Sequence, residues 1–247
     1  MAEILELYKK VGETPLECIL RFKSANPLFE EVKMAYLGRL DPMAEGLLLV
    51  LTGSGSKEQY FSLDKTYEFE VLWGVETDTY DILGEIISVG KFPEKLEKKM
   101  DSLIRKISAK KTQVYPPYSS KAVGGKKLFM WAREGKIEEI DRPERGIKIF
   151  SLEHIHTRLT TGQEILADVS QRIALVKGDF RQDKILGLWQ KALEDRLDEK
   201  FLVSKFSADV STGTYIRGLA HEMGKAMNTG AIAYGIKRTR VGEYKVG

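Results

Sequence analysis

Apolar and polar positions follow one another in patterns that predict strands and helices in an irregular order. Period-two alternation with β-branched and aromatic residues predicts strands over 67–73, 147–159, 165–176, 201–210 and 231–236, and a short apolar run predicts a buried strand over 47–51. Apolar spacing of three and four predicts helices that begin at Pro27, at Pro93 and near Thr214. The first of these is expected to run into the loop at Gly38. Neighbouring strands with helices inserted irregularly indicate an α+β fold.

The domain organisation is expected to be simple. No repeat, low-complexity tract or Gly/Ser linker divides the 247 residues, so we predict a single domain over residues 1–247. Pro116-Pro117 and Gly124-Gly125 bracket a loop that leads to a short helix over 126–133, and this excursion, at about 112–148, is predicted to project from the body. The pattern from Gly178 to Trp189 fits no motif.

Composition excludes several classes of protein. Hydrophobic residues make up 43% of the chain and charged residues 30%, and no apolar segment is long enough to span a membrane. The N-terminus carries Glu3 and Glu6 where a secretory signal needs positive charge, so we expect a cytoplasmic protein. Cys18, the only cysteine, lies among apolar residues and predicts a buried thiol. His154 and His156 lack further ligands nearby, and we expect no metal.

Basic residues are concentrated in two segments, although the net charge is only +3. Between Arg105 and Arg133 there are eight basic residues and no acid, with four aromatic residues interleaved (Tyr115, Tyr118, Phe129 and Trp131). Such a surface can neutralise phosphates and stack on bases. A second group, Lys237, Arg238, Arg240 and Lys245, lies near the C-terminus. The alternative is a pair of ordinary solvated surfaces.

The loop around Asp41 places a carboxylate beside a buried strand. Pro42 restricts Asp41 to extended backbone. Gly38 and Gly46 permit tight turns on either side of Asp41, ahead of the apolar run 47–51. The carboxylate is therefore expected to be held rigidly. An Asp-Pro turn is by itself more often structural than catalytic.

Five sequence blocks, taken in chain order, resemble the TruB family of tRNA pseudouridine synthases. They are Gly12-Glu13-Thr14-Pro15; Asp41-Pro42-Met43-Ala44-Glu45-Gly46; Lys65-Thr66-Tyr67 with Thr77-Asp78-Thr79-Tyr80-Asp81-Ile82-Leu83-Gly84; Gln113-Val114-Tyr115-Pro116-Pro117-Tyr118-Ser119-Ser120-Lys121 with Gly125-Lys126-Lys127-Leu128; and Ser211-Thr212-Gly213-Thr214-Tyr215-Ile216-Arg217 with Arg238-Thr239-Arg240-Val241-Gly242. The resemblance covers most of the chain. It implies the pseudouridine synthase fold, a mixed, mostly antiparallel sheet flanked by helices, in which 112–148 is a thumb that grips RNA.

The resemblance also implies roles for individual residues. Asp41 would be the nucleophile, Tyr67 would pack on the flipped base, and Arg217 would pair with Asp41. The reaction would need no cofactor and no metal. Residues implied to bind the substrate are Arg39, Tyr215, Lys121, Lys126, Lys127, Arg238 and Arg240. The alternatives are a core aromatic residue at Tyr67 and a surface arginine at Arg217.

The chain departs from the family pattern in several places. Tyr36 stands where the family has a histidine, and Arg39-Leu40-Asp41 is similar to the Arg-Leu-Asp motif of the RluA and RsuA families. Arg39 is thus an alternative ion-pair partner for Asp41. The segment 159–200 is longer than its family counterpart, and we expect no C-terminal RNA-binding domain of the kind that many relatives carry.

These features together predict an enzyme that isomerises the uridine (U55) in the TΨC loop of tRNA. We expect RNA, and specifically the T-arm of tRNA, as the partner, with no membrane partner and a monomeric protein. One alternative is a pseudouridine synthase of ribosomal RNA, which Arg39 and the expected lack of an accessory domain favour. Another is a module that mainly binds or folds RNA, in which the thumb and the basic tail matter more than Asp41.

Overall fold

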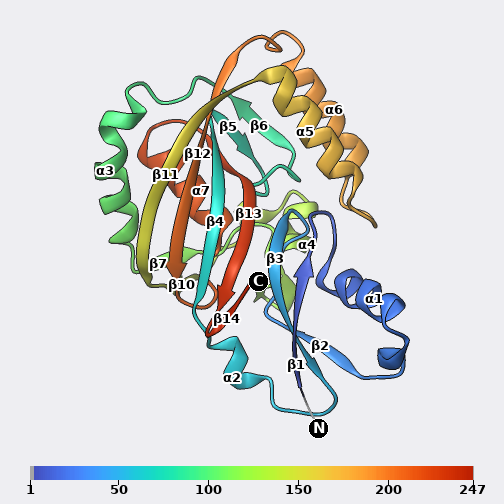
Figure 1. Ribbon diagram of the computed structural model, residues 1–247. Coiled ribbons are helices and arrows are strands. Elements are labelled where there is room, and N and C mark those ends of the chain that lie inside the picture. Colours follow the sequence, from blue (N-terminus) through green and yellow to red (C-terminus); the bar gives the residue numbers. More distant parts are fainter. Residues whose placement is uncertain (1–2, 247) are drawn as a thin grey trace.

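An eight-stranded sheet runs through the molecule in the computed structural model, which describes residues 3–246 (Figure 1). The strands are β1 (Ile4–Lys9), β2 (Met34–Leu37), β3 (Ala44–Thr52), β4 (Lys65–Trp73), β11 (Ile149–Thr161), β12 (Lys200–Val210), β13 (Ala231–Val241) and β14 (Tyr244–Lys245). Six of them form the path β1-β3-β13-β4-β12-β11, while β2 pairs with β3 and β14 with β13. The β13–β3 pair is parallel and the other pairs of this sheet are antiparallel. The predicted α+β class is confirmed.

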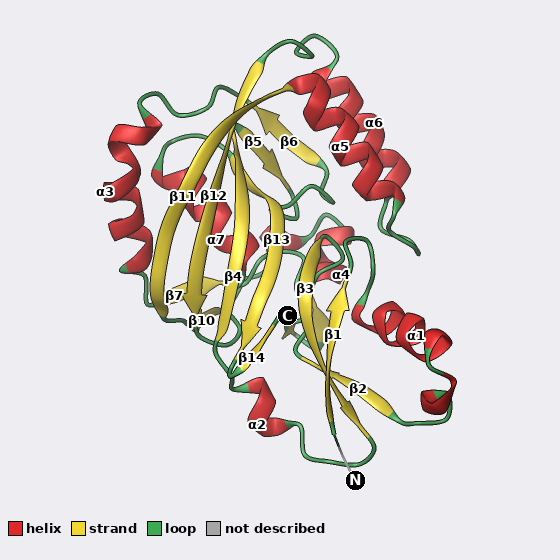
Figure 2. Cartoon of the chain, viewed as in Figure 1, coloured by secondary structure: helices red, strands yellow, loops and turns green. Residues whose placement is uncertain are grey.

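Helices cover both faces of this sheet (Figure 2). They are α1 (Pro15–Ala25), α2 (Glu58–Phe61), α3 (Leu96–Ser108), α4 (Leu128–Arg133), α5 (Gly162–Ala174), α6 (Gln182–Leu193) and α7 (Ile216–Ala226), with 3₁₀ turns η1 (Pro27–Phe29) and η2 (Ile137–Glu139). Alternation along β4 sends Phe69 and Val71 toward α3 and α7, and Leu72 toward α5 and α6. The helices predicted from Pro93 and near Thr214 are confirmed as α3 and α7.

The N-terminal part of the sheet carries the loop that contains Asp41. In β3, Leu48 and Val50 pack against Cys18 of α1, whose predicted burial is confirmed. Strand β3 pairs with β13 over residues 44–46 and with β1 over residues 46–51. It crosses from one partner strand to the other at Gly46, which has φ +107°. A Cβ at Gly46 would lie 2.2 Å from the carbonyl oxygen of Arg238, so this crossing requires glycine.

The helix predicted from Pro27 into the Gly38 loop is wrong. A single 3₁₀ turn, η1, is followed by strand β2. Leu28, the first apolar residue of the supposed helical face, is 94% exposed, so its burial does not stabilise a helix there. Hydrogen bonding of β2 to the edge of β3 supplies the backbone partners instead, a tertiary contact that a local pattern does not reveal.

The strand predicted over 165–176 is also wrong, because this segment is helix α5. Its start is fixed by a capping box, in which Thr161 and Glu164 exchange side-chain to backbone hydrogen bonds. Ile165, Val169 and Ile173 then recur every four residues and are fully buried. The period of the apolar positions was therefore helical.

The remaining strands are short and lie outside the main sheet. They are β5 (Val75–Thr77), β6 (Ile86–Val89), β7 (Thr112–Val114), β8 (Ala122–Val123), β9 (Lys126–Lys127) and β10 (Glu144–Gly146). Pairing of β7 with β10 brings the chain back to the point where the excursion 115–143 began. The excursion carries the β8–β9 hairpin and helix α4. Within residues 3–246, no helix has the length and apolar character needed to cross a membrane.

Candidate active site

A cleft of about 540 Å³ opens between the Asp41 loop, the start of α7, the excursion 115–143 and the turn between α5 and α6. Segments that are far apart in the sequence therefore meet at one place. Its lining includes the three residues predicted to be catalytic, Asp41, Tyr67 and Arg217. It also includes Phe180 and Arg181, from a stretch whose sequence fits no motif.

Asp41 and Arg217 form an ion pair at the floor of the cleft. Arg217 Nε donates to Asp41 Oδ2 at 2.7 Å. The arginine side chain is 4% exposed and the aspartate side chain 41% exposed. One carboxylate is thus aimed by a buried cation while part of it remains open to the cleft.

The guanidinium of Arg217 has further partners on every side. Nη1 donates to the Thr79 carbonyl oxygen at 2.5 Å, and Nη2 donates to the Tyr118 carbonyl oxygen at 3.2 Å. A second carboxylate, Asp81, lies 3.6 Å from Nε. Burial opposes the charged form, but Asp41 and Asp81 outweigh this effect and raise the pKa of Arg217. The group is a fixed cation with a single orientation.

Asp81 is the buried member of this network. Its side chain accepts from Thr79 Oγ1 at 2.6 Å and from the Leu83 amide at 3.0 Å. Burial raises the pKa of Asp81 to about 6, although the neighbouring Arg217 opposes the shift. Two carboxylates therefore share Arg217, one open to the cleft and one buried behind it.

Two buried cations hold the backbone of the Asp41 loop. Lys9 Nζ donates to the carbonyl oxygens of Ala44 at 2.5 Å and Pro42 at 3.3 Å. Arg238 donates to the carbonyl oxygens of Leu47, Arg39 and Gly38, at 2.8, 3.3 and 3.4 Å. Both side chains are fully buried. Burial lowers the pKa of Lys9 to about 8.

Two residues of the C-terminal basic group, Arg238 and Arg240, were expected to contact RNA, and the structure shows both engaged by other groups of the protein. Arg238 is fully buried, and its guanidinium donates to the carbonyl oxygens of Leu47, Arg39 and Gly38. It still belongs to the lining of the cleft, where three of its hydrogen bonds hold the loop. Arg240 is part-exposed and pairs with Asp209 at 2.9 Å, so its charge is largely compensated.

The alternative partner for Asp41, Arg39, lies at the wall of the cleft. Its side chain is exposed, and no ion pair within residues 3–246 involves it. Arg217 occupies the position beside Asp41. Arg39 therefore remains available for a ligand in the cleft.

Tyr67 and Tyr215 form part of the cleft wall. Tyr67 is 7% exposed, on β4 between Ala208 of β12 and Arg238 of β13. The backbone of Tyr215 is fixed by Gln113, which accepts from its amide at 2.8 Å and donates to its carbonyl at 3.0 Å. Burial and the nearby Asp41 raise the pKa of Tyr215.

The three lysines predicted at the thumb do not line the cleft; they neighbour Ser120 and Phe129, which do, and this outer edge of the cleft is called the rim. Lys121 and Lys127 are exposed, with ammonium groups 5.7 Å from the Tyr115 ring and 5.8 Å from the Phe129 ring. Lys126 is 4.4 Å from the Trp131 ring and pairs with Glu134. The thumb segment thus combines cations with aromatic faces.

Several members of the site were missed from the sequence. Asp81 stands in a block that carried the resemblance, but only its burial behind Arg217 reveals a role. Lys9 is the last residue of strand β1, and a lysine at the end of a strand usually indicates contact with solvent. The contribution of Thr79 and Tyr118 is made by backbone oxygens, which leave no sequence signal.

The structure resembles solved protein structures over nearly its whole length. It matches a chain in the crystal structure of a Cbf5-Nop10-Gar1 complex with a TM-score of 0.57 and 20% identity, covering 98% of this chain and 49% of that one. A chain in an H/ACA RNP bound to a substrate RNA containing 2'-deoxyuridine matches with a TM-score of 0.54 and 18% identity, covering 98% and 48%. At these identities the comparison defines the class of fold.

Sequence comparison gives the family. Residues 26–178 match the model of the TruB family pseudouridylate synthase N-terminal domain. A tRNA pseudouridine synthase B from Listeria welshimeri is 30% identical over 99% of this chain and 68% of its own length, and one from Heliobacterium modesticaldum is 27% identical over 98% and 65%. The chain belongs to the TruB family of pseudouridylate synthases. It spans about two thirds of the length of these relatives.

Proposed function

We propose that this chain is an RNA pseudouridine synthase whose substrate is the uridine (U55) in the TΨC loop of tRNA, with Asp41 as the nucleophile. The observation that carries the proposal is the Asp41–Arg217 pair at the floor of a cleft whose rim bears exposed lysines and aromatic rings. The tRNA pseudouridine synthases from Listeria welshimeri and Heliobacterium modesticaldum, which align with nearly the whole chain, support the choice of tRNA.

The chemistry is an isomerisation in which atoms and electrons balance within the substrate. The C1′–N1 bond of uridine breaks, the base turns, and a C5–C1′ bond forms. C5 loses its hydrogen and N1 gains one, so neither a redox partner nor a cofactor is required. Asp41 either forms a covalent bond with the substrate or places negative charge beside the substrate atoms that become electron-poor. Attack on the sugar and attack on the base both fit this role.

Arg217 prepares Asp41 for this step. A buried guanidinium with fixed partners holds the carboxylate directed into the cleft without reorganisation during the reaction. Tyr67 lies at the wall, where its ring offers an apolar surface to the base and its hydroxyl a group for proton transfer at C5.

The target uridine must leave its stack to reach Asp41. Extrusion of a base costs a few kcal/mol, which contacts to the rest of the RNA must offset. We propose that the thumb, residues 112–148, supplies these contacts through Lys121, Lys126 and Lys127 and the rings beneath them.

A second candidate is a pseudouridine synthase that acts on ribosomal RNA. Arg39 favours this second candidate. It is exposed at the cleft wall, and the sequence Arg39-Leu40-Asp41 is similar to the Arg-Leu-Asp motif of the RluA and RsuA families. In this reading Arg39 contacts the RNA near the flipped base, while Arg217 still pairs with Asp41.

Mapping of pseudouridine in tRNA and ribosomal RNA tests these proposals. Transcripts without modification are incubated with wild-type protein or with Asp41→Asn, and modified positions are then sequenced. We expect a new pseudouridine in the TΨC loop with wild type only. Modification confined to ribosomal RNA would replace the first candidate by the second. RNA binding without any isomerisation by wild type would indicate the binding module.

A further inference from the structure

The helices α5 and α6 interrupt a hairpin that could have been closed by a short turn. Strands β11 and β12 stay paired up to Thr161 and Lys200. Antiparallel neighbours of this kind need only a two-residue connection. Here the connection is 162–199, with two helices and a turn, 175–181, that reaches back toward α4 and the cleft (Figure 1).

This connection is a rigid part of the molecule. Ile165 of α5 and Ile185 and Trp189 of α6 are fully buried against the sheet. The Trp189 indole also donates to the Ile82 carbonyl oxygen at 3.2 Å, one residue after Asp81. The turn between the helices is therefore held at a fixed place relative to the floor of the cleft.

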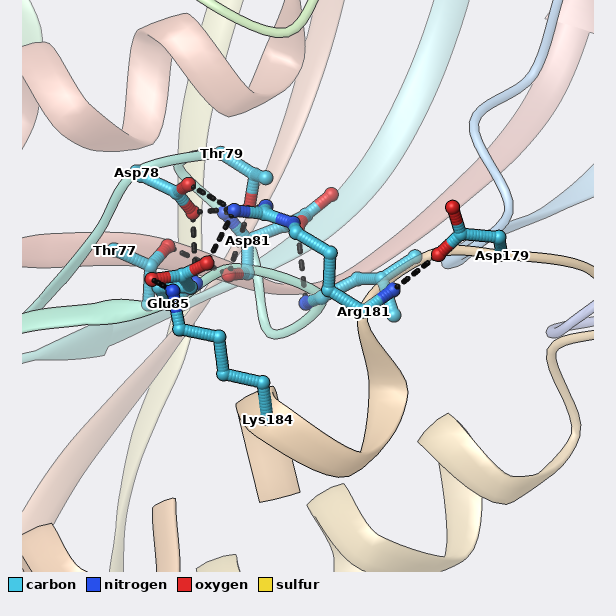
Figure 3. Close-up of polar contacts among 9 residues, drawn as sticks. Thr77, Asp78, Thr79, Asp81, Glu85, Asp179, Arg181 and Lys184 are labelled. Carbon is cyan, nitrogen blue, oxygen red and sulfur yellow. Dashed lines mark hydrogen bonds and ion pairs between the residues drawn. The ribbon is translucent and has the colours of Figure 1, made fainter. Parts of the chain in front are cut away.

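Arg181 projects from this turn into a group of acidic side chains (Figure 3). Its Nη1 donates to Asp78 Oδ2 at 2.8 Å and to Glu85 Oε1 at 2.7 Å. Its backbone adopts φ +65°, a conformation that a non-glycine residue holds only where its surroundings impose it. Because two carboxylates compensate its charge, Arg181 is poorly suited to neutralise a phosphate.

The guanidinium of Arg181 also lies over the ring of Tyr118, 4.6 Å from its centroid. The Tyr118 carbonyl oxygen in turn accepts from Arg217 Nη2. A chain of contacts thus runs from the turn through Tyr118 and Arg217 to Asp41. Burial and the neighbouring Asp78 raise the pKa of the Tyr118 hydroxyl, so the ring stays neutral beneath Arg181.

The same turn holds the thumb at a second point. Arg133, at the end of α4, donates to the Asp179 carbonyl oxygen at 2.6 Å and lies 3.4 Å from the Asp179 carboxylate. Both ends of the segment 118–133 are therefore tied to 179–181.

We propose that Arg181 is a positioning residue, which fixes Tyr118 at the base of the thumb and thereby the direction of Arg217 and Asp41. The α5–α6 connection makes the position of the thumb and the alignment of the nucleophile interdependent. This inference rests on the proposed isomerisation of uridine, because its kinetic effect is measured in that reaction.

Comparison of Arg181→Gln with Lys184→Gln tests the inference. Lys184 is the matched control, because it pairs with the same Glu85 at 2.6 Å and its side chain is 63% exposed. The cation that lies over the Tyr118 ring is Arg181 and not Lys184. Measurements are the single-turnover rate of pseudouridine formation at saturating protein, the dissociation constant for RNA and its salt dependence. Arg181→Lys serves as a second variant, because it keeps the charge without the planar group that stacks on Tyr118.

We expect Arg181→Gln to lower the single-turnover rate by about 10- to 100-fold, as misplaced catalytic groups do, with an unchanged dissociation constant and salt slope. Arg181→Lys should fall between it and wild type, and Lys184→Gln should match wild type. A weaker RNA affinity with a smaller salt slope and an unchanged rate would overturn the inference in favour of a phosphate contact. Equal behaviour of Arg181→Gln and Lys184→Gln would overturn it in favour of a purely structural turn.

Hydrogen exchange in free protein separates this inference from the proposed function. Peptides that cover 115–121 should exchange faster in Arg181→Gln than in Lys184→Gln, at equal melting temperatures. If wild type forms no pseudouridine in any RNA, the proposed function fails, while exchange still reports whether Arg181 fixes Tyr118. Unchanged exchange in 115–121 contradicts the inference whatever the activity.

Discussion

Arg217 at the floor of the cleft and Lys127 at its rim carry the same charge in opposite surroundings. The arginine is 4% exposed and meets two carboxylates and two carbonyl oxygens. The lysine is exposed, contacts the face of Phe129, and takes part in no ion pair within residues 3–246. A compensated, immobile charge can orient a reacting group, whereas an uncompensated one can release counterions when it meets a phosphate. Floor and rim should therefore affect rate and affinity separately.

The largest expected effect is at Asp41. Asp41→Asn removes the carboxylate while it keeps the size of the side chain and leaves the loop held by Lys9 and Arg238. We expect the single-turnover rate to fall by at least about 10⁴-fold, as for loss of a nucleophile, with RNA affinity unchanged. Rate and binding are measured on the same transcript. Loss of binding together with rate would mean that floor and rim are not separable.

Arg217→Lys tests whether orientation matters beyond charge. Lysine keeps the positive charge, but its compact ammonium cannot reach Asp41, the Thr79 carbonyl and the Tyr118 carbonyl at once. We expect a rate loss of about 10²- to 10³-fold. A wild-type rate in this variant would show that charge alone suffices at the floor.

Asp81 gives the floor a pH dependence that the rim lacks. With its pKa raised by burial to about 6, Asp81 loses its charge as the pH falls through 6, and Arg217 keeps only Asp41 as an anionic partner. We expect the rate to fall below about pH 6 in wild type, and this limb to be absent in Asp81→Asn, whose rate at pH 7.5 is lower by about 10-fold.

Stability should respond to Asp81 in the opposite direction. A carboxyl whose pKa is raised from 3.8 to about 6 binds its proton more tightly in the folded chain, so its ionisation opposes folding. Its contribution to the free energy of unfolding therefore increases as the pH falls from 6 to 4. Urea unfolding of wild type and Asp81→Asn across this range checks the sign; a parallel pH dependence of the two proteins would contradict it.

The smallest effect on rate is expected at the rim. Lys126→Ala with Lys127→Ala should weaken RNA binding and reduce the slope of log affinity against log salt by about 1 to 2, with the saturated rate unchanged. Lys127→Ala alone should account for most of the change, because Lys126 is already paired with Glu134. An unchanged slope in the double variant would exclude the thumb as an electrostatic clamp.

The floor and the rim of the cleft also differ in how far the sequence predicted them. The rim was predictable, because lysines between aromatic residues keep their character wherever the loop lies. The floor was predictable only in part. Asp41 and Arg217 came from their blocks, but Arg238, from the same block as Arg217, is fully buried beneath the Asp41 loop. The pairing of β13 with β3 and β4 decides what the Arg238 side chain meets, and this pairing is a tertiary fact.

By itself the sequence determined the α+β class, helices α3 and α7 and most strands with clear alternation, because local periodicity encodes these. Short motifs also singled out Asp41, Tyr67 and Arg217 as candidates, and the structure brings all three to one cleft. The tertiary structure alone decided that 27–37 ends as a strand, that Asp81 lies behind Arg217, and that Lys9 and Arg238 hold the loop. It also brought Arg181 against Tyr118. Burial and contact between distant segments create these roles, and neither leaves a local pattern.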